Sequence, residues 1–363
     1  MISGAAPIGI AIGSDGVSQK LDAVFEGGGV RGIGLVGAIS VVEAKGYRFE
    51  NVVGTSAGAI VATLVAAGYS ATELKDAINS IDFRRMTDLA APGTIPGIGI
   101  ALNILTKLGI YEGDYFLGLM RELLGAKKKK FFGDLVMPAY QDDPRYRYKA
   151  QVVASDVTRG KMLVLPGHAQ DFGIPPDELE IARAARMSMS IPFFFKPVRQ
   201  ESRAPASGTS LIVDGGLLSD FPVELLDAPG VPAWPTFGFR LVEAADPTLA
   251  RYDITGPISY LKAIIGTATS AHDARYIETH KFVRSILVQT HGIGATAFEL
   301  GAPEKDLLFQ SGVDAATEFL ASWDFEAYKA AYRAGMPPPS RRELSALALE
   351  PTRPPSALVG QPV

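Results

Sequence analysis

A serine between two glycines is the first feature of this sequence that could do chemistry. Ser56 is the central residue of G-T-S-A-G, which matches the G-x-S-x-G pattern of a nucleophile elbow. The flanking Gly54 and Gly58 permit the tight, strained turn that lifts a serine hydroxyl out of a sheet and places it at the N-terminus of a helix. Ordinary turns of small residues share this pattern, but here a strand-like segment precedes it and a helix-like segment follows it. This placement favours a nucleophile.

A glycine-rich segment upstream of the serine could hold a negative charge. Residues 27–32 read G-G-G-V-R-G, after a strand-like stretch and before a helix-like one. Glycines let consecutive backbone N–H groups face one point, and the following helix adds partial positive charge, so the segment predicts an anion-binding cradle. It also matches the dinucleotide-binding pattern G-x-G-x-x-G, but the second strand then ends in Gly54, Thr55 and Ser56 rather than in an acidic residue. We therefore disfavour a nucleotide-binding oxidoreductase.

An aspartate directly after a later strand completes the set. Asp214 follows the apolar run L-I-V and precedes Gly215 and Gly216. The carboxyl end of a parallel strand is where the active sites of α/β proteins form. Taken alone, Asp214 reads as a loop residue beside a turn. Together with a nucleophile and an anion cradle, it supplies the base that acyl transfer requires.

The three motifs, in this order, resemble those of the patatin-like phospholipase family. That family carries a glycine-rich block, then G-x-S-x-G, then D-G-[GA], as this chain does. Residues 185–195, A-R-M-S-M-S-I-P-F-F-F, are similar to the family's alanine- and serine-rich helix that runs into an apolar loop. The resemblance covers roughly residues 21–320.

The resemblance implies a lipid acyl hydrolase with a Ser-Asp dyad. Ser56 would be the nucleophile, and Asp214 would take its proton directly, without a histidine. The reaction would pass through an acyl-serine that water hydrolyses, and the substrates would be phospholipids, lysophospholipids or neutral glycerides. The motif-supporting residues would be Gly54, Gly58, Gly215 and Gly216. The oxyanion hole would be built from the block Gly27, Gly28, Gly29, Val30, Arg31 and Gly32, although Arg31 could instead pair with a structural carboxylate.

Other readings of the same residues stay open. The chain has four histidines, His168, His272, His280 and His291, and the chain order allows a Ser-Asp-His triad of Ser56, Asp214 and His291. Against a triad, the elbow follows the second strand, earlier than in most α/β-hydrolases. An acyltransferase or thioesterase would use the same serine. A non-enzymatic lipid-binding protein is disfavoured because the serine, the aspartate and the cradle are all present.

The elements around the motifs predict a three-layer α/β/α fold with a mainly parallel central sheet. Strand, glycine turn and helix occur twice in succession near the start, which is the pattern of parallel strands with crossover helices. Ser70 and Glu73 form the sequence signature of a capping box. The predicted strands are 21–26, 49–53, 146–154, 161–165, 210–213, 236–242 and 284–289. The predicted helices are 33–45, 57–67, one opening at Ser70, 114–124, 176–189, 258–280 and 304–323.

Length and composition limit the domain organisation and the chemistry. The 363 residues suit one domain over 21–330, with a loose lead at 1–20 and a proline-rich, disordered tail at 331–363. A net charge of −4 does not draw the chain to nucleic acid, and the absence of cysteine excludes disulfides and thiolate catalysis. No metal-ligand spacing is visible, so we expect no metal and no cofactor. The apolar residues 1–12 lack a basic leader, which predicts a cytoplasmic protein or export without a Sec signal.

Three segments could meet lipid. Residues 127–130 are four lysines followed by Phe131 and Phe132, which is compatible with peripheral membrane contact or with a solvated loop. Residues 91–111 mix glycine, proline and aliphatic residues, as in a buried irregular connection or a mobile apolar lid. The three phenylalanines at 193–195 could line an acyl tunnel or belong to the core.

Overall fold

The computed structural model describes most of the predicted catalytic domain. The described residues are 19–81, 83–86, 88, 103–104, 106–202, 208–227, 230–243, 263, 267 and 283–334. Most of the predicted N-terminal lead, nearly all of the predicted tail, and most of the predicted segments 91–111 and 258–280 lie outside these residues.

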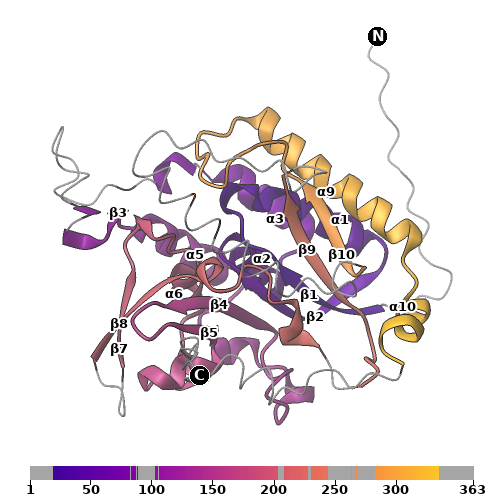
Figure 1. Cartoon of the computed structure of the whole chain (residues 1–363), viewed down its shortest axis with the longest axis horizontal. Helices are drawn as coiled ribbons and strands as arrows, with labels where there is room; N and C mark the ends of the chain where they lie inside the picture. Colours follow the sequence, from indigo (N-terminus) through magenta and orange to yellow (C-terminus); the bar gives the residue numbers. More distant parts are fainter. Residues whose placement is uncertain are drawn as a thin grey trace, which may run out of the picture.

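A mixed, mainly parallel sheet forms the centre of the molecule (Figure 1). The strand order is β10-β9-β1-β2-β4-β8-β7, and β5 pairs with β4. Strands β10, β9, β1, β2 and β4 are parallel neighbours, whereas β8 runs antiparallel to both β4 and β7. The strands are β1 Gln19–Phe25, β2 Tyr47–Thr55, β4 Ala150–Asp156, β5 Lys161–Leu165, β7 Val198–Ser202, β8 Gly208–Asp214, β9 Thr236–Val242 and β10 Ser285–Gln289. A second, two-stranded parallel sheet pairs β3 (Gly109–Tyr111) with β6 (Phe193–Phe195).

Alternating side chains give the sheet two apolar faces. Val52 faces the large core formed with the helices. The next residue, Val53, faces a smaller cluster with Val24 and Val153. This second cluster is closed by the 3₁₀ turn Val223–Leu226. The period of two is the one that a strand buried on both faces must have.

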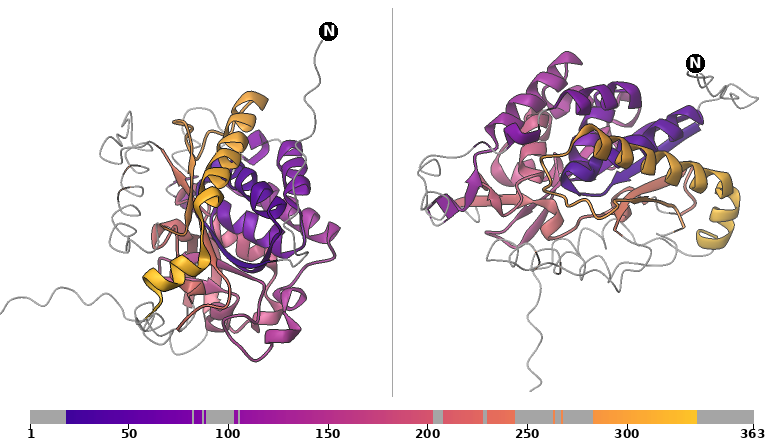
Figure 2. Two further views of the ribbon diagram at one scale, coloured as in Figure 1. Left: turned by 90° about the vertical axis from the view of Figure 1, so that its right-hand side faces the viewer. Right: turned by 90° about the horizontal axis from the view of Figure 1, so that it is seen from above.

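Helices pack on the large core. They are α1 Ile33–Ala44, α2 Ala57–Ala66, α3 Ala71–Ser80, α5 Asp114–Ala126, α6 Ile181–Ser188, α9 Ala302–Ser322 and α10 Phe325–Tyr332. Figures 1 and 2 show α9 lying along α1, and these two helices share the most extensive contact between elements. No described helix has the length and apolar composition needed to cross a membrane.

Glycines allow α1 and α9 to touch through their backbones. A Cβ atom placed on Gly312 of α9 would lie 1.9 Å from the carbonyl oxygen of Gly34 in α1. A Cβ atom placed on Gly37 of α1 would lie 1.9 Å from the carbonyl oxygen of Phe309 in α9. Neither position accepts a side chain without moving the helices apart.

Local signals in the sequence correctly predicted several helix ends. The predicted capping box is present, because Glu73 N–H donates to Ser70 Oγ (3.3 Å) and Ser70 N–H donates to Glu73 Oε2 (2.9 Å). Gly46, just after α1, has φ +86°, the left-handed conformation expected of a glycine that ends a helix.

The predicted helix 176–189 is too long. Pro176–Glu178 is a 3₁₀ turn, and α6 begins only at Ile181. The intervening backbone bonds to a neighbouring segment instead: Phe132 N–H donates to Leu179 O (3.0 Å) and Ile181 N–H donates to Lys130 O (3.0 Å). These long-range hydrogen bonds replace the local ones of a helix.

Candidate active site

The ends of β2 and β8 meet on one edge of β4. Strand β2 pairs with Ala150–Val153, and β8 pairs with Ala154–Asp156. Strand β5 takes the other edge. Thr55 therefore ends β2 at the point where Asp214 ends β8, although about 160 residues separate them in the chain. The residue after β2 and the last residue of β8 are brought together by this pairing.

Ser56 adopts the strained turn that the sequence pattern predicts. Its φ of 51° and ψ of −119° are unusual for a residue with a side chain, and it forms the N-cap of α2. The two flanking glycines leave room for this turn. A Cβ atom on Gly54 would lie 2.1 Å from the carbonyl oxygen of Gly58, and one on Gly58 would lie 2.1 Å from that of Phe25.

The hydroxyl of Ser56 and the carboxylate of Asp214 form a short hydrogen bond. Ser56 Oγ donates to Asp214 Oδ2 at 2.6 Å, and Gly216 N–H donates to Asp214 Oδ1 at 2.8 Å. Ser56 and Asp214 are each 6% exposed. Burial raises the pKa of Asp214 to about 7, while the Ser56 hydrogen bond opposes this and the nearby charge of Asp220 adds to it. A carboxylate with this pKa accepts a proton near neutral pH.

Two serines from the end of α6 hold this pair in place. Ser188 Oγ accepts from Ser56 N–H at 2.8 Å and donates to Val153 O at 2.5 Å. Ser190 O accepts from Asp214 N–H at 2.9 Å. Neither role is predicted above; the only signal for them in the sequence is the alanine- and serine-rich stretch 185–195 that resembles the family.

The glycine-rich turn lies directly against Ser56. A Cβ atom on Gly27 would lie 3.1 Å from Ser56 Cβ. Gly29 has φ +57°, and a Cβ atom there would lie 1.9 Å from Ala295 O. The structure thus brings all three predicted motifs to one place.

Several amides of this turn already have acceptors within the protein. Gly27 N–H donates to Asp220 O (3.3 Å) and Val30 N–H donates to Ala295 O (3.0 Å). Arg31 N–H donates to Gly28 O (3.2 Å). Within the described residues, the N–H groups of Gly28 and Gly29 donate to no protein acceptor.

Comparisons with known proteins place the chain in a family. The family model described as "Patatin-like phospholipase" matches residues 23–227. The uncharacterized protein YqhO of Bacillus subtilis (strain 168) is 35% identical over 305 residues, which is 84% of this chain and 99% of YqhO. The chain belongs to the patatin-like phospholipase family. This membership supports a lipid-hydrolase function.

More distant relatives agree with the patatin-like fold. The uncharacterized NTE family protein Rv2565 of Mycobacterium tuberculosis is 26% identical over 267 residues, which is 70% of this chain and 38% of that protein. The crystal structure of VipD from Legionella pneumophila aligns with a TM-score of 0.51 and 18% identity, covering 84% of this chain and 67% of VipD. This likeness confirms the predicted three-layer α/β/α fold class.

The remaining motif residues make structural contacts in this patatin-like chain. Arg31 pairs with Glu243 (Nη1 to Oε1, 2.8 Å) and its Nε donates to Gly28 O (3.2 Å). A Cβ atom on Gly32 would lie 3.2 Å from Ala57 Cβ, and one on Gly215 would lie 2.3 Å from Val153 O. Arg31 thus has the carboxylate partner that the structural reading of this residue required.

The described histidines form their hydrogen bonds with residues outside the dyad. His291 is exposed, and its Nε2 lies 3.2 Å from Ser311 Oγ. His168 Nδ1 accepts from Val164 N–H (2.8 Å), and burial lowers the His168 pKa to about 4. His272 and His280 lie outside the described residues. Neither described histidine therefore supports the triad alternative.

The segments proposed for lipid contact are partly internal. Lys127 pairs with Glu73 (2.7 Å), and Lys129 Nζ donates to Asp134 O (2.7 Å). Phe132 is fully buried, whereas Phe131 is 38% exposed. Only part of this basic and aromatic segment faces outward.

Of the three phenylalanines at 193–195, Phe194 and Phe195 belong to an aromatic cluster with Tyr111 of β3. Phe195 is buried, with 1% exposure, and is a core residue. Phe194 stacks on Phe298 with ring centroids 5.3 Å apart and lies 4.8 Å from the Tyr111 ring.

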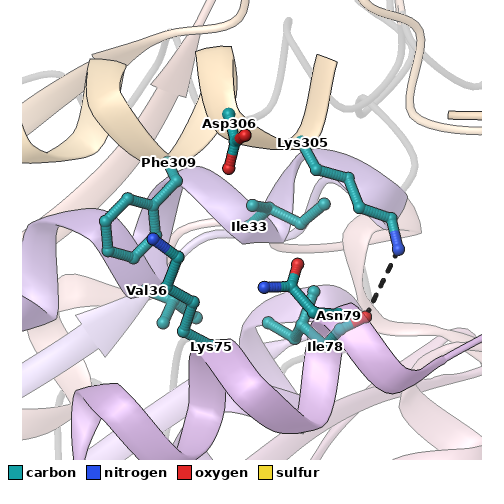
Figure 3. A pocket seen from close by; sticks show the side chains of 8 residues that line it. All are labelled: Ile33, Val36, Lys75, Ile78, Asn79, Lys305, Asp306 and Phe309. Atoms are coloured by element: carbon teal, nitrogen blue, oxygen red, sulfur yellow. Dashed lines mark hydrogen bonds between the residues drawn. The ribbon is translucent and has the colours of Figure 1, made fainter. Parts of the chain in front are cut away.

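A shallow crevice with no room for an enclosed water molecule lies elsewhere, between α1, α3 and α9 (Figure 3). Figure 3 shows Lys75 reaching over the Phe309 ring, 3.9 Å from its centroid, and Lys305 donating to Ile78 O (3.5 Å). Its lining contains none of the motif residues. Among the described residues, no group of three or more histidine, aspartate or glutamate side chains is placed to hold a metal ion.

Proposed function

We propose that the chain is a lipid acyl hydrolase that cleaves carboxylic esters with the dyad Ser56 and Asp214. One observation carries the proposal: a serine at the apex of a strained elbow donates a 2.6 Å hydrogen bond to a buried carboxylate. A nucleophile held by a base of raised pKa is the arrangement that acyl transfer through serine needs. Family membership supports lipid esters as the substrates.

The reaction would run in two balanced halves. As Ser56 Oγ attacks the ester carbonyl, its proton passes to Asp214, and the carbonyl oxygen becomes an oxyanion. When the carbon–oxygen bond to the alcohol breaks, Asp214 returns that proton to the leaving oxygen, which leaves an acyl-serine. Water then attacks in the same way, and Asp214 takes and returns the proton so that the fatty acid departs and Ser56 is restored.

The oxyanion would be held by backbone amides of the glycine-rich turn. Of the six residues predicted from the sequence, Gly28 and Gly29 are the best donors, because the amides of Gly27, Val30 and Arg31 have acceptors within the protein. A donor of this kind contributes about 3 kcal/mol to the barrier reduction. Gly32 supports the turn through its contact with the start of α2.

A lipid hydrolysis panel tests the proposal. Vesicles of mixed phospholipids, lysophospholipids and a triglyceride emulsion are incubated with the protein, and products are measured by mass spectrometry. We expect fatty acid release by the wild type, and losses of about 1,000-fold or more in Ser56→Ala and Asp214→Asn, because each removes one half of the dyad. Ser322→Ala and Asp314→Asn, at exposed positions of α9, are matched controls that should keep wild-type activity.

Labelling with a fluorophosphonate probe gives an independent test. The wild type should be labelled at Ser56, and Ser56→Ala should not be. Absence of labelling in folded wild type would contradict the proposal and favour a lipid-binding protein. Adding an alcohol or lysolipid acceptor to the panel separates hydrolysis from acyl transfer. If no histidine takes part in the reaction, His291→Ala should retain activity.

A further inference from the structure

A second carboxyl group, Asp220, shares the space around the proposed dyad. A Cβ atom on Gly216 would lie 3.0 Å from Asp220 Oδ1 and 3.1 Å from Asp214 Oδ1. The two carboxyl oxygens therefore face the same side of one glycine. A Cβ atom on Gly27 would lie 2.1 Å from Asp220 Oδ1 and 3.1 Å from Ser56 Cβ, so Asp220 also borders the nucleophile.

Glycines lie beside both of these side chains. Gly216 donates its N–H to Asp214 Oδ1, and Gly27 donates its N–H to the backbone carbonyl of Asp220. With no side chain at either glycine, little intervening material screens one carboxylate from the other. Like charges held this close raise each other's affinity for protons.

The charges that face Asp220 come from three elements. Asp214 faces it from the end of β8. Two cations also face it: Arg31 from the glycine-rich turn, with the larger effect, and Arg240 from β9. Burial raises the pKa of the Asp220 carboxyl, and both arginines oppose that rise.

Each of the two arginines also has a second carboxylate partner. Arg31 Nη1 lies 2.8 Å from Glu243 Oε1, and Arg240 Nη2 lies 3.4 Å from Glu26 Oε1. Their positive charge is therefore divided between Asp220 and these glutamates. Asp220 thus keeps a net negative influence on its neighbour Asp214, whose pKa its charge raises.

We propose that Asp220 is a positioning residue whose charge strengthens Asp214 as the base for Ser56. This inference rests on the proposed function. An ordinary carboxylate is a poor base for a serine hydroxyl, and the dyad has no histidine, so a neighbouring negative charge supplies basicity that burial alone provides only in part. Arg31 and Arg240 hold that charge next to Gly216.

The pH profile of Asp220→Asn tests this inference, because the substitution keeps the shape and removes the charge. kcat/KM for a water-soluble nitrophenyl ester is measured from about pH 5 to about pH 9. We expect the acid limb to move down by about one pH unit, and the plateau to fall about 3- to 10-fold, because Asp214 becomes a weaker base. Asp314→Asn, which removes a carboxylate at an exposed position of α9, is the control, and its acid limb should stay close to the wild-type position.

An unmoved acid limb in folded Asp220→Asn, with activity lowered or unchanged, would overturn the inference and leave Asp220 a packing residue. If that variant does not fold, the ¹³C carboxyl resonances of Asp214 and Asp220 are titrated in the wild type. Two mutually dependent steps are expected, each perturbed by the ionisation of the other group. Independent titrations would contradict the inference. This measurement needs no activity, so it separates failure of the inference from failure of the proposed function.

Discussion

At the scale of single residues, the site depends on a few hydroxyl and amide contacts that fix Ser56 in a strained conformation. A residue at φ 51° persists only when its surroundings over-determine it. Ser188 is the buried partner of the Ser56 amide, and it connects the elbow to β4 through Val153 O. The helix end that supplies Ser188 is therefore part of the site.

Replacing Ser188 by alanine should lower both activity and stability. The change leaves the Ser56 N–H and the Val153 carbonyl without this buried partner, which costs about 1–3 kcal/mol. We expect kcat/KM to fall about 10- to 100-fold because the nucleophile loses its fixed orientation. Fluorophosphonate labelling rates and urea unfolding measure the two effects. Ser40→Ala, which removes only a local hydrogen bond to Gly37 O within α1, is the control. Equal losses of activity and stability in Ser40→Ala would contradict a special role for Ser188.

The raised pKa of Asp214 predicts the acid limb of the wild-type pH profile. Asp214 must be ionised to accept the Ser56 proton, so activity rises with pH and levels off above the pKa of about 7. Below that value, kcat/KM should fall about tenfold for each pH unit. A stopped-flow or plate assay with an uncharged ester measures it. A midpoint near the ordinary aspartate value of about 4 would mean that the free protein does not bury Asp214 as described.

The motif residues could be predicted from the sequence, whereas their supporting contacts could not. Gly54, Ser56 and Gly58 make a turn whose requirements are local, so the pattern alone reveals it. Ser188 and Asp220 come near the dyad through long-range contacts: Ser188 bonds to Ser56 and Val153, and Asp220 follows β8, which pairs antiparallel with β4. Nothing local in residues 208–214 indicates that direction.

At the scale of elements, predictions from local sequence signals again fail where long-range contacts decide the structure. Strand and helix periodicity and the capping box at Ser70 identified most elements, because these signals lie within a few residues. Residues 176–180 were wrongly included in a helix, because the backbone of residues 179–181 bonds to residues 130–132 instead. Long-range pairing thus overrode the local preference.

The contact between α1 and α9 gives a prediction for an element. Gly312→Leu should destabilise the fold by about 3 kcal/mol, because a side chain there would meet the backbone of α1 and force the helices apart. The measurement is the urea midpoint at constant m-value.

Gly118→Ala is the matched control for Gly312→Leu. Gly118 lies in α5 with nothing within 4 Å of an added Cβ, so alanine should stabilise the helix by about 0.5–1 kcal/mol. Equal effects of the two substitutions would show that helix propensity, and not the α1–α9 contact, explains the change.

At the scale of the whole molecule, the proposed base should cost the fold stability. Asp214 is buried, and its pKa of about 7 in the folded state exceeds its value of about 3.9 in an unfolded chain. Between these values the folded state binds more protons than the unfolded state, so the free energy of unfolding falls as pH rises through this window. Asp22, buried at the other end of the sheet, has a pKa raised to about 7 chiefly by burial and adds a change of the same sign. Exposed acids with lowered pKa values, such as Glu73, act in the opposite direction and are screened by solvent.

A difference measurement isolates the contribution of Asp214 from all other groups. Asp214→Asn resembles the protonated aspartate at every pH, so the free energy of unfolding of the variant minus that of the wild type should increase between about pH 4 and about pH 7, by a few kcal/mol at most. The variant should be inactive and, above neutral pH, more stable than the wild type, as expected where function requires a destabilising group. Urea unfolding at several pH values measures this difference. The same experiment on Asp22→Asn should show the same trend without loss of the dyad. A difference that stays flat with pH for Asp214→Asn would mean that Asp214 titrates alike in folded and unfolded chains, and the basicity assigned to it would then need another source.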